Sequence, residues 1–180
     1  MLFRSPVPGA GGMKPMVAHA VDAALASKAR PVIVVLGHEQ ANVRALLAGR
    51  DVVFAANPDY ADGLSTSLRT GIKALPKDVD GAVVLLGDMP RVGSAEVDAL
   101  IGAFNPVEGR AICVPTHRGK RGNPVLFGSA FFETMAEAAG DTGAKHLIGE
   151  HADQVAEVEI DSDAVLADID DPAALAKVQG

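Results

Sequence analysis

Two short runs of aliphatic residues, 32–36 and 82–86, constrain the fold of this chain more than any other feature. Both contain only Ala, Val, Ile and Leu, and a glycine follows each of them, Gly37 and Gly87. A strand with one face in water alternates polar and apolar residues, whereas a strand covered on both faces is continuously apolar. We therefore expect two internal strands of a sheet that carries helices on both faces.

Weaker strand signals and helical repeats alternate along the rest of the chain. The further strands are expected at 52–55, 111–115, 124–127 and 155–160, with an exposed loop over 118–123. Amphipathic helices are expected after Pro15, up to Gly49, over 64–75, after Ser94, after Ser129, over 141–150 and after Asp171-Pro172. This order predicts an α/β fold with a mostly parallel sheet and right-handed crossovers.

Length, charge and cysteine content exclude several classes of protein. The 180 residues suggest one domain, 1–180, and the excess of 23 acidic over 16 basic residues argues against a nucleic acid or an anionic membrane as partner. No apolar run approaches the ~20 residues of a membrane-spanning helix. With a single cysteine, Cys113, and no export signal, we expect a cytoplasmic protein without disulfides.

Familiar catalytic loops fail by their spacing. The glycines within 9–12 would form a dinucleotide loop only if position 14 were glycine, and it is Lys14. Residues 63–67 begin like a hydrolase nucleophile elbow but end in serine, and Gly119-Lys120 lacks the following Ser or Thr of a phosphate loop. The chain therefore does not predict a covalent nucleophile or a nicotinamide site.

Asp88 is the strongest single candidate for a functional side chain. It directly follows the run 82–86, and ligands of open α/β sheets bind beyond the carboxyl ends of the strands. Mg²⁺ prefers one or two carboxylates, together with phosphate oxygens and water. The alternative is that Asp88 only stabilises the turn before Pro90.

A second acidic group lies near the C-terminus. Asp168 and Asp170 alternate around Ile169, so that in an extended segment both carboxylates point to one side. One of them is expected to supply a second metal ligand. The alternative is that Asp170 or Asp171 caps a terminal helix.

The segment 63–71 combines a flexible glycine, three hydroxyls and the start of a helix. Unpaired N–H groups at a helix start, with neighbouring hydroxyls, are suited to bind a base, a ribose or a phosphate. The alternative is that Ser65 simply caps the helix.

Five separated blocks of sequence resemble the MobA/MocA-like nucleotidyltransferases, especially the molybdenum cofactor cytidylyltransferase branch. The blocks are Val34–Glu39, Asn57–Arg69, Leu85–Pro90, Arg121–Phe127 and Asp168–Pro172, in the family's order. The resemblance implies a Rossmann-like three-layer fold and Mg²⁺-dependent transfer of CMP from CTP to molybdopterin, with a molybdoenzyme as a further partner. A non-catalytic protein that binds the molybdenum cofactor, an oxidoreductase on the same scaffold, and GTP in place of CTP remain alternatives.

The resemblance also implies roles for individual residues. Asp88 would be a metal ligand and catalytic residue, with Asp170 or Asp168 as its partner. Gly63, Ser65, Ser67 and Arg69 would line the nucleotide pocket, and Arg121, Gly122 and Asn123 would lie by the acceptor. Family members often have histidine where this chain has Asn123.

The family's opening strand and glycine-rich phosphate loop have no counterpart in this sequence. Arg4, Lys14 and the glycines within 9–12 are poor substitutes for the arginine, lysine and amides of that loop. The resemblance therefore implies that the first strand is missing, through a start codon assigned too late, a shortened chain or a paralogue that has lost catalysis. We expect weak or no activity from the chain as it stands.

Overall fold

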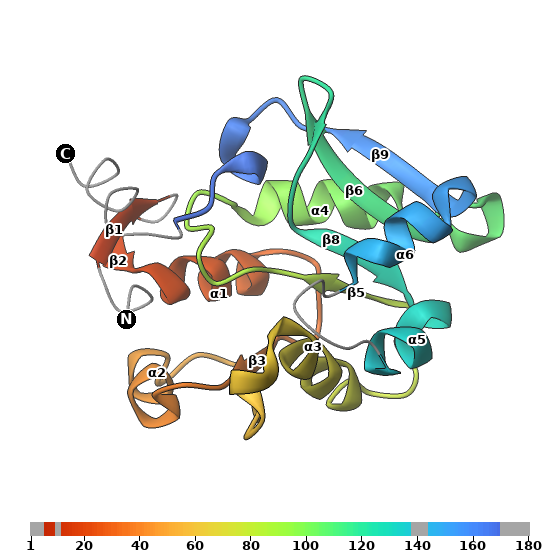
Figure 1. Cartoon of the computed structure of the whole chain (residues 1–180). Coiled ribbons are helices and arrows are strands. Elements are labelled where there is room, and N and C mark those ends of the chain that lie inside the picture. Colours follow the sequence, from red (N-terminus) through yellow and green to blue (C-terminus); the bar gives the residue numbers. More distant parts are fainter. Residues whose placement is uncertain (1–5, 10–11, 138–143, 170–180) are drawn as a thin grey trace.

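The computed structural model describes residues 6–9, 12–137 and 144–169 (Figure 1). The strands are β1 (Pro6–Gly9), β2 (Gly12–Pro15), β3 (Ile33–Leu36), β4 (Val53–Ala56), β5 (Gly81–Val84), β6 (Ile112–His117), β7 (Lys120–Arg121), β8 (Val125–Gly128) and β9 (Val155–Glu159). The α-helices are α1 (Met16–Ala26), α2 (Gln40–Leu46), α3 (Leu64–Lys73), α4 (Ser94–Ala103), α5 (Phe132–Glu137) and α6 (Lys145–Glu150). None of these helices is long and apolar enough to cross a bilayer.

The alternation of strands and helices expected from the sequence is confirmed. The two aliphatic runs contribute β3 and β5, although Leu85 and Leu86 lie beyond the end of β5, and Pro15 immediately precedes α1. The β1–β2 hairpin was not expected, because three prolines within 6–15 are unusual in strands. The expected helix after Asp171-Pro172 lies outside the described residues.

The sheet is mixed, which corrects the expectation of mostly parallel pairing. β8 runs antiparallel to both β5 and β6, whereas β3 with β4 and β6 with β9 are parallel. The cause is a two-residue hairpin between β6 and β7, in which Arg118 and Gly119 have φ angles of +51° and +75°. Positive φ at both central positions matches the right-handed twist of paired strands, so the chain reverses here and returns as β8.

β3 and β5 belong to separate sheets. β3 pairs with β4 and β5 pairs with β8, and no strand within the described ranges pairs with both. The residues of β5 are only half-buried, whereas those of β8 are fully buried. Within the described residues both strands therefore lie at sheet edges, which corrects the expectation of two internal strands.

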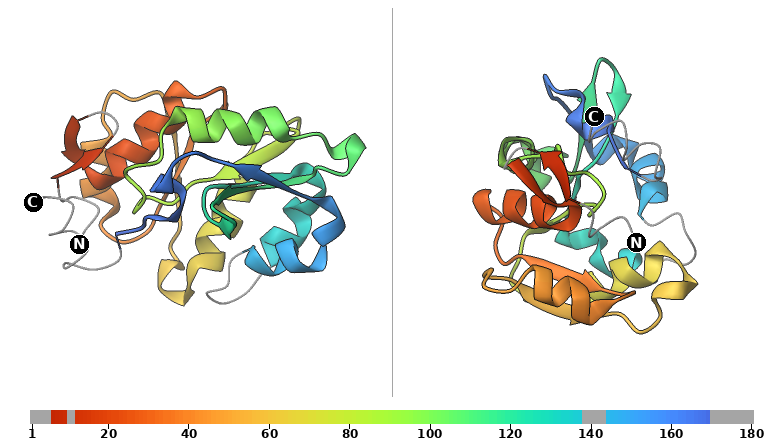
Figure 2. Two further views of the ribbon diagram at one scale, coloured as in Figure 1. Left: turned by 90° about the horizontal axis from the view of Figure 1, so that it is seen from above. Right: turned by 90° about the vertical axis from the view of Figure 1, so that its left-hand side faces the viewer.

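The core lies on both faces of the larger sheet, as the two-residue period of a strand requires. Ile112 of β6 packs with Met135 of α5 and Leu147 of α6, and the adjacent Cys113 packs with Leu100 of α4 on the other face. All five side chains are fully buried. Figure 2 shows the resulting layers, with α1 and α4 on one side of the sheet and α5 and α6 on the other.

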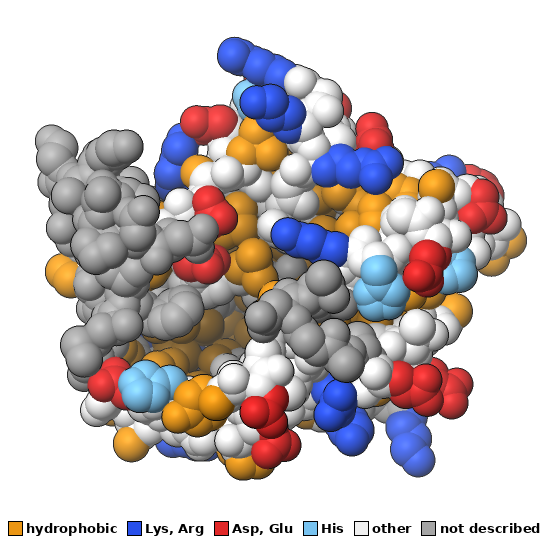
Figure 3. Space-filling view, in the orientation of Figure 1, with side chains coloured by type: hydrophobic (Ala, Val, Ile, Leu, Met, Phe, Trp, Pro, Cys, Tyr) orange, Lys and Arg blue, Asp and Glu red, His pale blue; other side chains and the backbone are white. Residues whose placement is uncertain are grey.

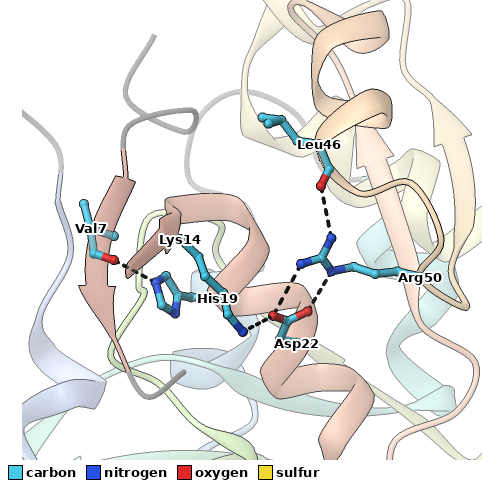
Figure 4. A network of polar contacts seen from close by, with 6 residues as sticks. All are labelled: Val7, Lys14, His19, Asp22, Leu46 and Arg50. Carbon is cyan, nitrogen blue, oxygen red and sulfur yellow. Dashed lines mark hydrogen bonds and ion pairs between the residues drawn. The ribbon is translucent and has the colours of Figure 1, made fainter. Parts of the chain in front are cut away.

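A polar network fastens the N-terminal hairpin to α1 (Figure 4). The carboxylate of Asp22 on α1 accepts hydrogen bonds from Lys14 Nζ at 2.6 Å and from Arg50 Nε at 2.7 Å. His19 Nε2 lies 2.9 Å from the carbonyl oxygen of Val7 in β1. The hydrogen bond from Arg50, followed by that from Lys14, lowers the pKa of Asp22 despite partial burial.

Candidate active site

Two acidic segments from distant parts of the chain lie side by side. Ile169 N donates a hydrogen bond to the carbonyl oxygen of Asp88 at 3.0 Å, and Asp168 is covalently bonded to that nitrogen. Oδ1 of Asp88 is shielded from solvent, whereas Asp168 is exposed. The backbone at Ile169 thus lies beside the Asp88 turn, whereas Asp170 lies outside the described residues, and the roles of Asp88, Asp168 and Asp170 as metal ligands remain predictions.

The carboxylates of Asp88 and Asp168 are suited in number and chemistry to a hard cation, because Mg²⁺ is usually held by one or two carboxylates and completes its shell with water and phosphate. Within residues 6–9, 12–137 and 144–169, no three His, Cys, Asp or Glu side chains group closely enough to form a metal site on their own. A cation at Asp88 would therefore need ligands from a substrate, from water or from Asp170.

The segment before β8 packs against the same C-terminal stretch. Asn123 N donates to the carbonyl oxygen of Val165 at 2.9 Å, and Gly122 N donates to Pro115 O at 2.9 Å. A Cβ atom at Gly122 would lie 2.1 Å from the Val165 oxygen, so only glycine fits there. Pro124 lies among the apolar residues Leu85, Leu86, Met89 and Val92. The expected acceptor block thus lies beside the Asp88 turn.

The start of α3 differs from a helix capped by serine. Gly63 is the N-cap residue with φ of +108°, a conformation that favours glycine, and no side chain caps the helix. Ser65 lies inside the helix rather than at its N-cap, so the alternative in which Ser65 caps the helix is wrong, and Ser65 is only 1% exposed. Leu68 of α3 and Val84 of β5 pack against one hydrophobic cluster, which places the first turns of α3 near the strand that leads to Asp88.

Two arginines expected at the site make contacts elsewhere. Arg69 Nε donates to the carbonyl oxygen of Ala136 on α5 at 2.8 Å, and Arg121 Nε donates to Glu157 at 2.7 Å on the surface. Figure 3 shows further Lys and Arg side chains gathered at the top of the molecule, over the β6–β7 hairpin. The contacts of Arg69 and Arg121 hold protein elements together. A role for either arginine in binding substrate therefore remains a prediction.

Two groups that follow β3 and β4 were not expected from the sequence to have a role. Asn57 is 1% exposed and makes three side-chain hydrogen bonds, two of them to hydroxyls of α3. Tyr60 is 43% exposed, and its ring centroid lies 5.9 Å from that of His38. An asparagine directly after a strand and before proline was the available signal for Asn57.

The architecture is that of the nucleotidyltransferases. A nucleotidyl transferase from Methanothermobacter thermautotroptrophicus superposes with a TM-score of 0.78 at 22% identity, covering 92% of this chain and 79% of that one. Rv0371c from Mycobacterium tuberculosis H37Rv gives a TM-score of 0.76 at 26% identity, over 92% of this chain and 84% of that one. Residues 8–155 match the MobA-like NTP transferase domain, and the chain belongs to this family.

Similarity to curated proteins is partial in length. The Bifunctional protein GlmU of Kineococcus radiotolerans is 32% identical over 153 residues, which are 84% of this chain and 30% of that protein. The GlmU of Cupriavidus necator is 38% identical over 93 residues, which are 49% of this chain and 19% of that protein. The chain therefore spans less than a third of the length of these relatives.

Proposed function

We propose that this protein transfers CMP from CTP to the phosphate of a molybdopterin-type acceptor and releases pyrophosphate. The observation that carries the proposal is the hydrogen bond from Ile169 to Asp88, which holds two acidic segments together at the end of the β5 segment. Membership of the MobA-like NTP transferase family supports the nucleotidyl transfer. A structure of Rv0371c, 24% identical to this chain, is a complex with manganese, which supports a divalent cation.

Each part of the site has a role in this reaction. Asp88 and Asp168, with Asp170 as a further ligand, would hold Mg²⁺, which lowers the charge barrier between the triphosphate and the incoming phosphate. An acceptor oxygen bonds to the α-phosphorus while the bond from that phosphorus to the bridging β-phosphate oxygen breaks. Gly63 and Ser67 would bind the nucleotide, whereas the side chain of Ser65, which is 1% exposed, is not available to it, and the 121–123 segment would contact the acceptor.

Turnover by this chain is expected to be slow. Lys14 is paired with Asp22 at 2.6 Å, so its charge is already compensated and it is not directed to a triphosphate. A lysine held by its own carboxylate makes no charge-assisted hydrogen bond to a phosphate, an interaction worth ~1.5–3 kcal/mol. Nucleotide binding is therefore a more dependable measurement than turnover for the first test.

The test compares Asp88→Asn with Asp161→Asn, an isosteric change at an exposed aspartate after β9. Calorimetric titration with CTP should show that Mg²⁺ strengthens binding to the wild type and to Asp161→Asn. In Asp88→Asn, the gain in CTP affinity that Mg²⁺ causes should be about 10- to 100-fold smaller than in the wild type. An unchanged response to Mg²⁺ in Asp88→Asn, with both variants folded, would show that Asp88 is not a metal ligand.

The nucleotide and the acceptor are tested separately. Pyrophosphate release should be fastest with CTP among the common nucleoside triphosphates and should require molybdopterin. Faster release with a sugar phosphate as acceptor would reassign the substrate, an outcome that the similarity to GlmU makes worth measuring. Tight binding of the molybdenum cofactor without turnover would favour a carrier role, and activity with a nicotinamide cofactor would favour an oxidoreductase.

A further inference from the structure

Asn57 is a fully buried polar residue at the end of the parallel β3–β4 pair. Its backbone N donates to the carbonyl oxygen of Leu36 at 2.8 Å, which extends the pairing one residue beyond Ala56. Its side chain is 1% exposed and faces the first turns of α3. A buried amide is costly unless its hydrogen-bonding groups are used, so its contacts define how it is oriented.

The orientation of the Asn57 amide is determined by a backbone donor. Oδ1 accepts a hydrogen bond from Asp59 N at 3.0 Å, and a backbone N–H cannot accept, so the oxygen must face Asp59. The two hydrogens of Nδ2 then point to α3, where they are donated to Thr66 Oγ1 at 2.9 Å and to Ser67 Oγ at 3.0 Å. Both hydroxyls therefore act as acceptors toward Asn57.

The two hydroxyls differ in where their own hydrogen goes. Thr66 Oγ1 lies 2.9 Å from Gly63 O and 3.0 Å from Asp59 O, and these carbonyls can only accept, so they take the hydroxyl hydrogen of Thr66. Within the described part of the chain, no acceptor takes the hydroxyl hydrogen of Ser67. Ser67 is half-buried, so its hydroxyl hydrogen is available to solvent or to a ligand.

We propose that Asn57 is a positioning residue that makes Ser67 a hydrogen-bond donor to the bound nucleotide. The inference rests on the proposed function, in which the start of α3 binds the nucleotide. It specifies the ligand atom that meets the hydroxyl hydrogen of Ser67 as an acceptor, either a carbonyl oxygen of the base or a phosphate oxygen. Asn57 itself touches only the protein.

The first test is a double-mutant cycle on CTP affinity. Asn57→Asp keeps the shape, but the new carboxylate takes the hydrogen of Ser67, so CTP should bind about 10-fold more weakly. Ser67→Ala should weaken binding by about 2- to 12-fold, the worth of one hydrogen bond. In the Ser67→Ala background, Asn57→Asp should cost little more, because the group through which it acts is gone. Additive losses would overturn the proposal.

The second test needs no nucleotide. The side-chain amide protons of Asn57, followed by NMR, should exchange slowly in the wild type, and Ser67→Ala should speed the exchange of one of them by at least several-fold. Unchanged exchange would show that Asn57 does not donate to Ser67. Because this measurement uses the free protein, it separates failure of the positioning role from failure of the proposed function, which would show as no binding of any nucleotide.

Controls keep the cycle interpretable. Asn42→Asp places the same new charge on the exposed surface of α2 and should leave CTP affinity unchanged. Urea unfolding identifies variants that lose affinity because they unfold. Comparing CTP with cytidine locates the acceptor atom: a loss for both ligands in Ser67→Ala indicates the nucleoside, and a loss for CTP alone indicates a phosphate oxygen.

Discussion

Replacing Gly122 with alanine is expected to destabilise the protein by about 2–4 kcal/mol. The added Cβ would lie 2.1 Å from the carbonyl oxygen of Val165 and 2.8 Å from its carbonyl carbon, where ordinary contacts begin near 3.4 Å. Because both neighbours belong to the backbone, the two segments must separate. Overpacking of this kind costs about 1–3 kcal/mol, and loss of the hydrogen bond from Asn123 to Val165 adds about 0.5–1.5 kcal/mol.

Urea unfolding of the purified protein measures this effect. With a slope of about 2 kcal/mol per molar urea, the midpoint should fall by about 1–2 M. Gly102→Ala on α4 is the matched control, since a Cβ there meets no atom within 4 Å and Gly102 does not have a positive φ. This control should be neutral or more stable by about 0.5–1 kcal/mol, because alanine favours helix more than glycine. If the free energy of unfolding of Gly122→Ala lies within about 0.5 kcal/mol of the wild-type value, the close approach of Gly122 to Val165 is refuted.

Two further predictions concern groups with shifted pKa values. Asp22→Asn removes the carboxylate that Lys14 and Arg50 hold, and should lower the free energy of unfolding near neutral pH by about 1 kcal/mol, a value reduced because the Asp22 side chain is 32% exposed. Since these partners lower the pKa of Asp22 in the folded state, the difference from wild type should be complete above about pH 4 and shrink as the pH falls further. A constant difference in urea or thermal unfolding from neutral to acidic pH would contradict this reasoning. Burial raises the pKa of Cys113 to about 11, so an aromatic disulfide reagent at about pH 8 should modify the native thiol only as fast as the protein opens, and rapid modification without unfolding would show that Cys113 is accessible.

The strands and helices that carry a strong local pattern were predictable. The runs that became β3 and β5 are continuously aliphatic, which correctly predicted strands there, but their expected place inside one sheet was wrong, because β5 is an edge strand and only half-buried. Pro15 before α1 followed from the proline preference at helix starts. The direction of β8 was not predictable in this way, because it depends on the two-residue turn at Arg118 and Gly119 rather than on any pattern within β8.

The candidate site divides along the same line. Asp88 was identified as a residue that follows a buried strand, and Asp168 as part of an alternating acidic segment. Only the tertiary structure shows that the backbone of Ile169 is hydrogen-bonded to the backbone of Asp88 and that Gly122 lies in close contact with the backbone of Val165. It also directs Arg69 to α5, a contact that sequence spacing could not reveal because the partner lies 67 residues away.

The amino-acid sequence by itself determined the class of fold, the order of most elements and the acidic residues available for chemistry, because these depend on side-chain type and on short-range periodicity. The tertiary structure alone decided which of these residues contact one another. It also decided whether the hydrogen of each hydroxyl is already used in a hydrogen bond within the protein. The physical reason is that a hydrogen bond between distant residues such as Asn57 and Ser67 exists only once the strand and the helix that carry them have packed together.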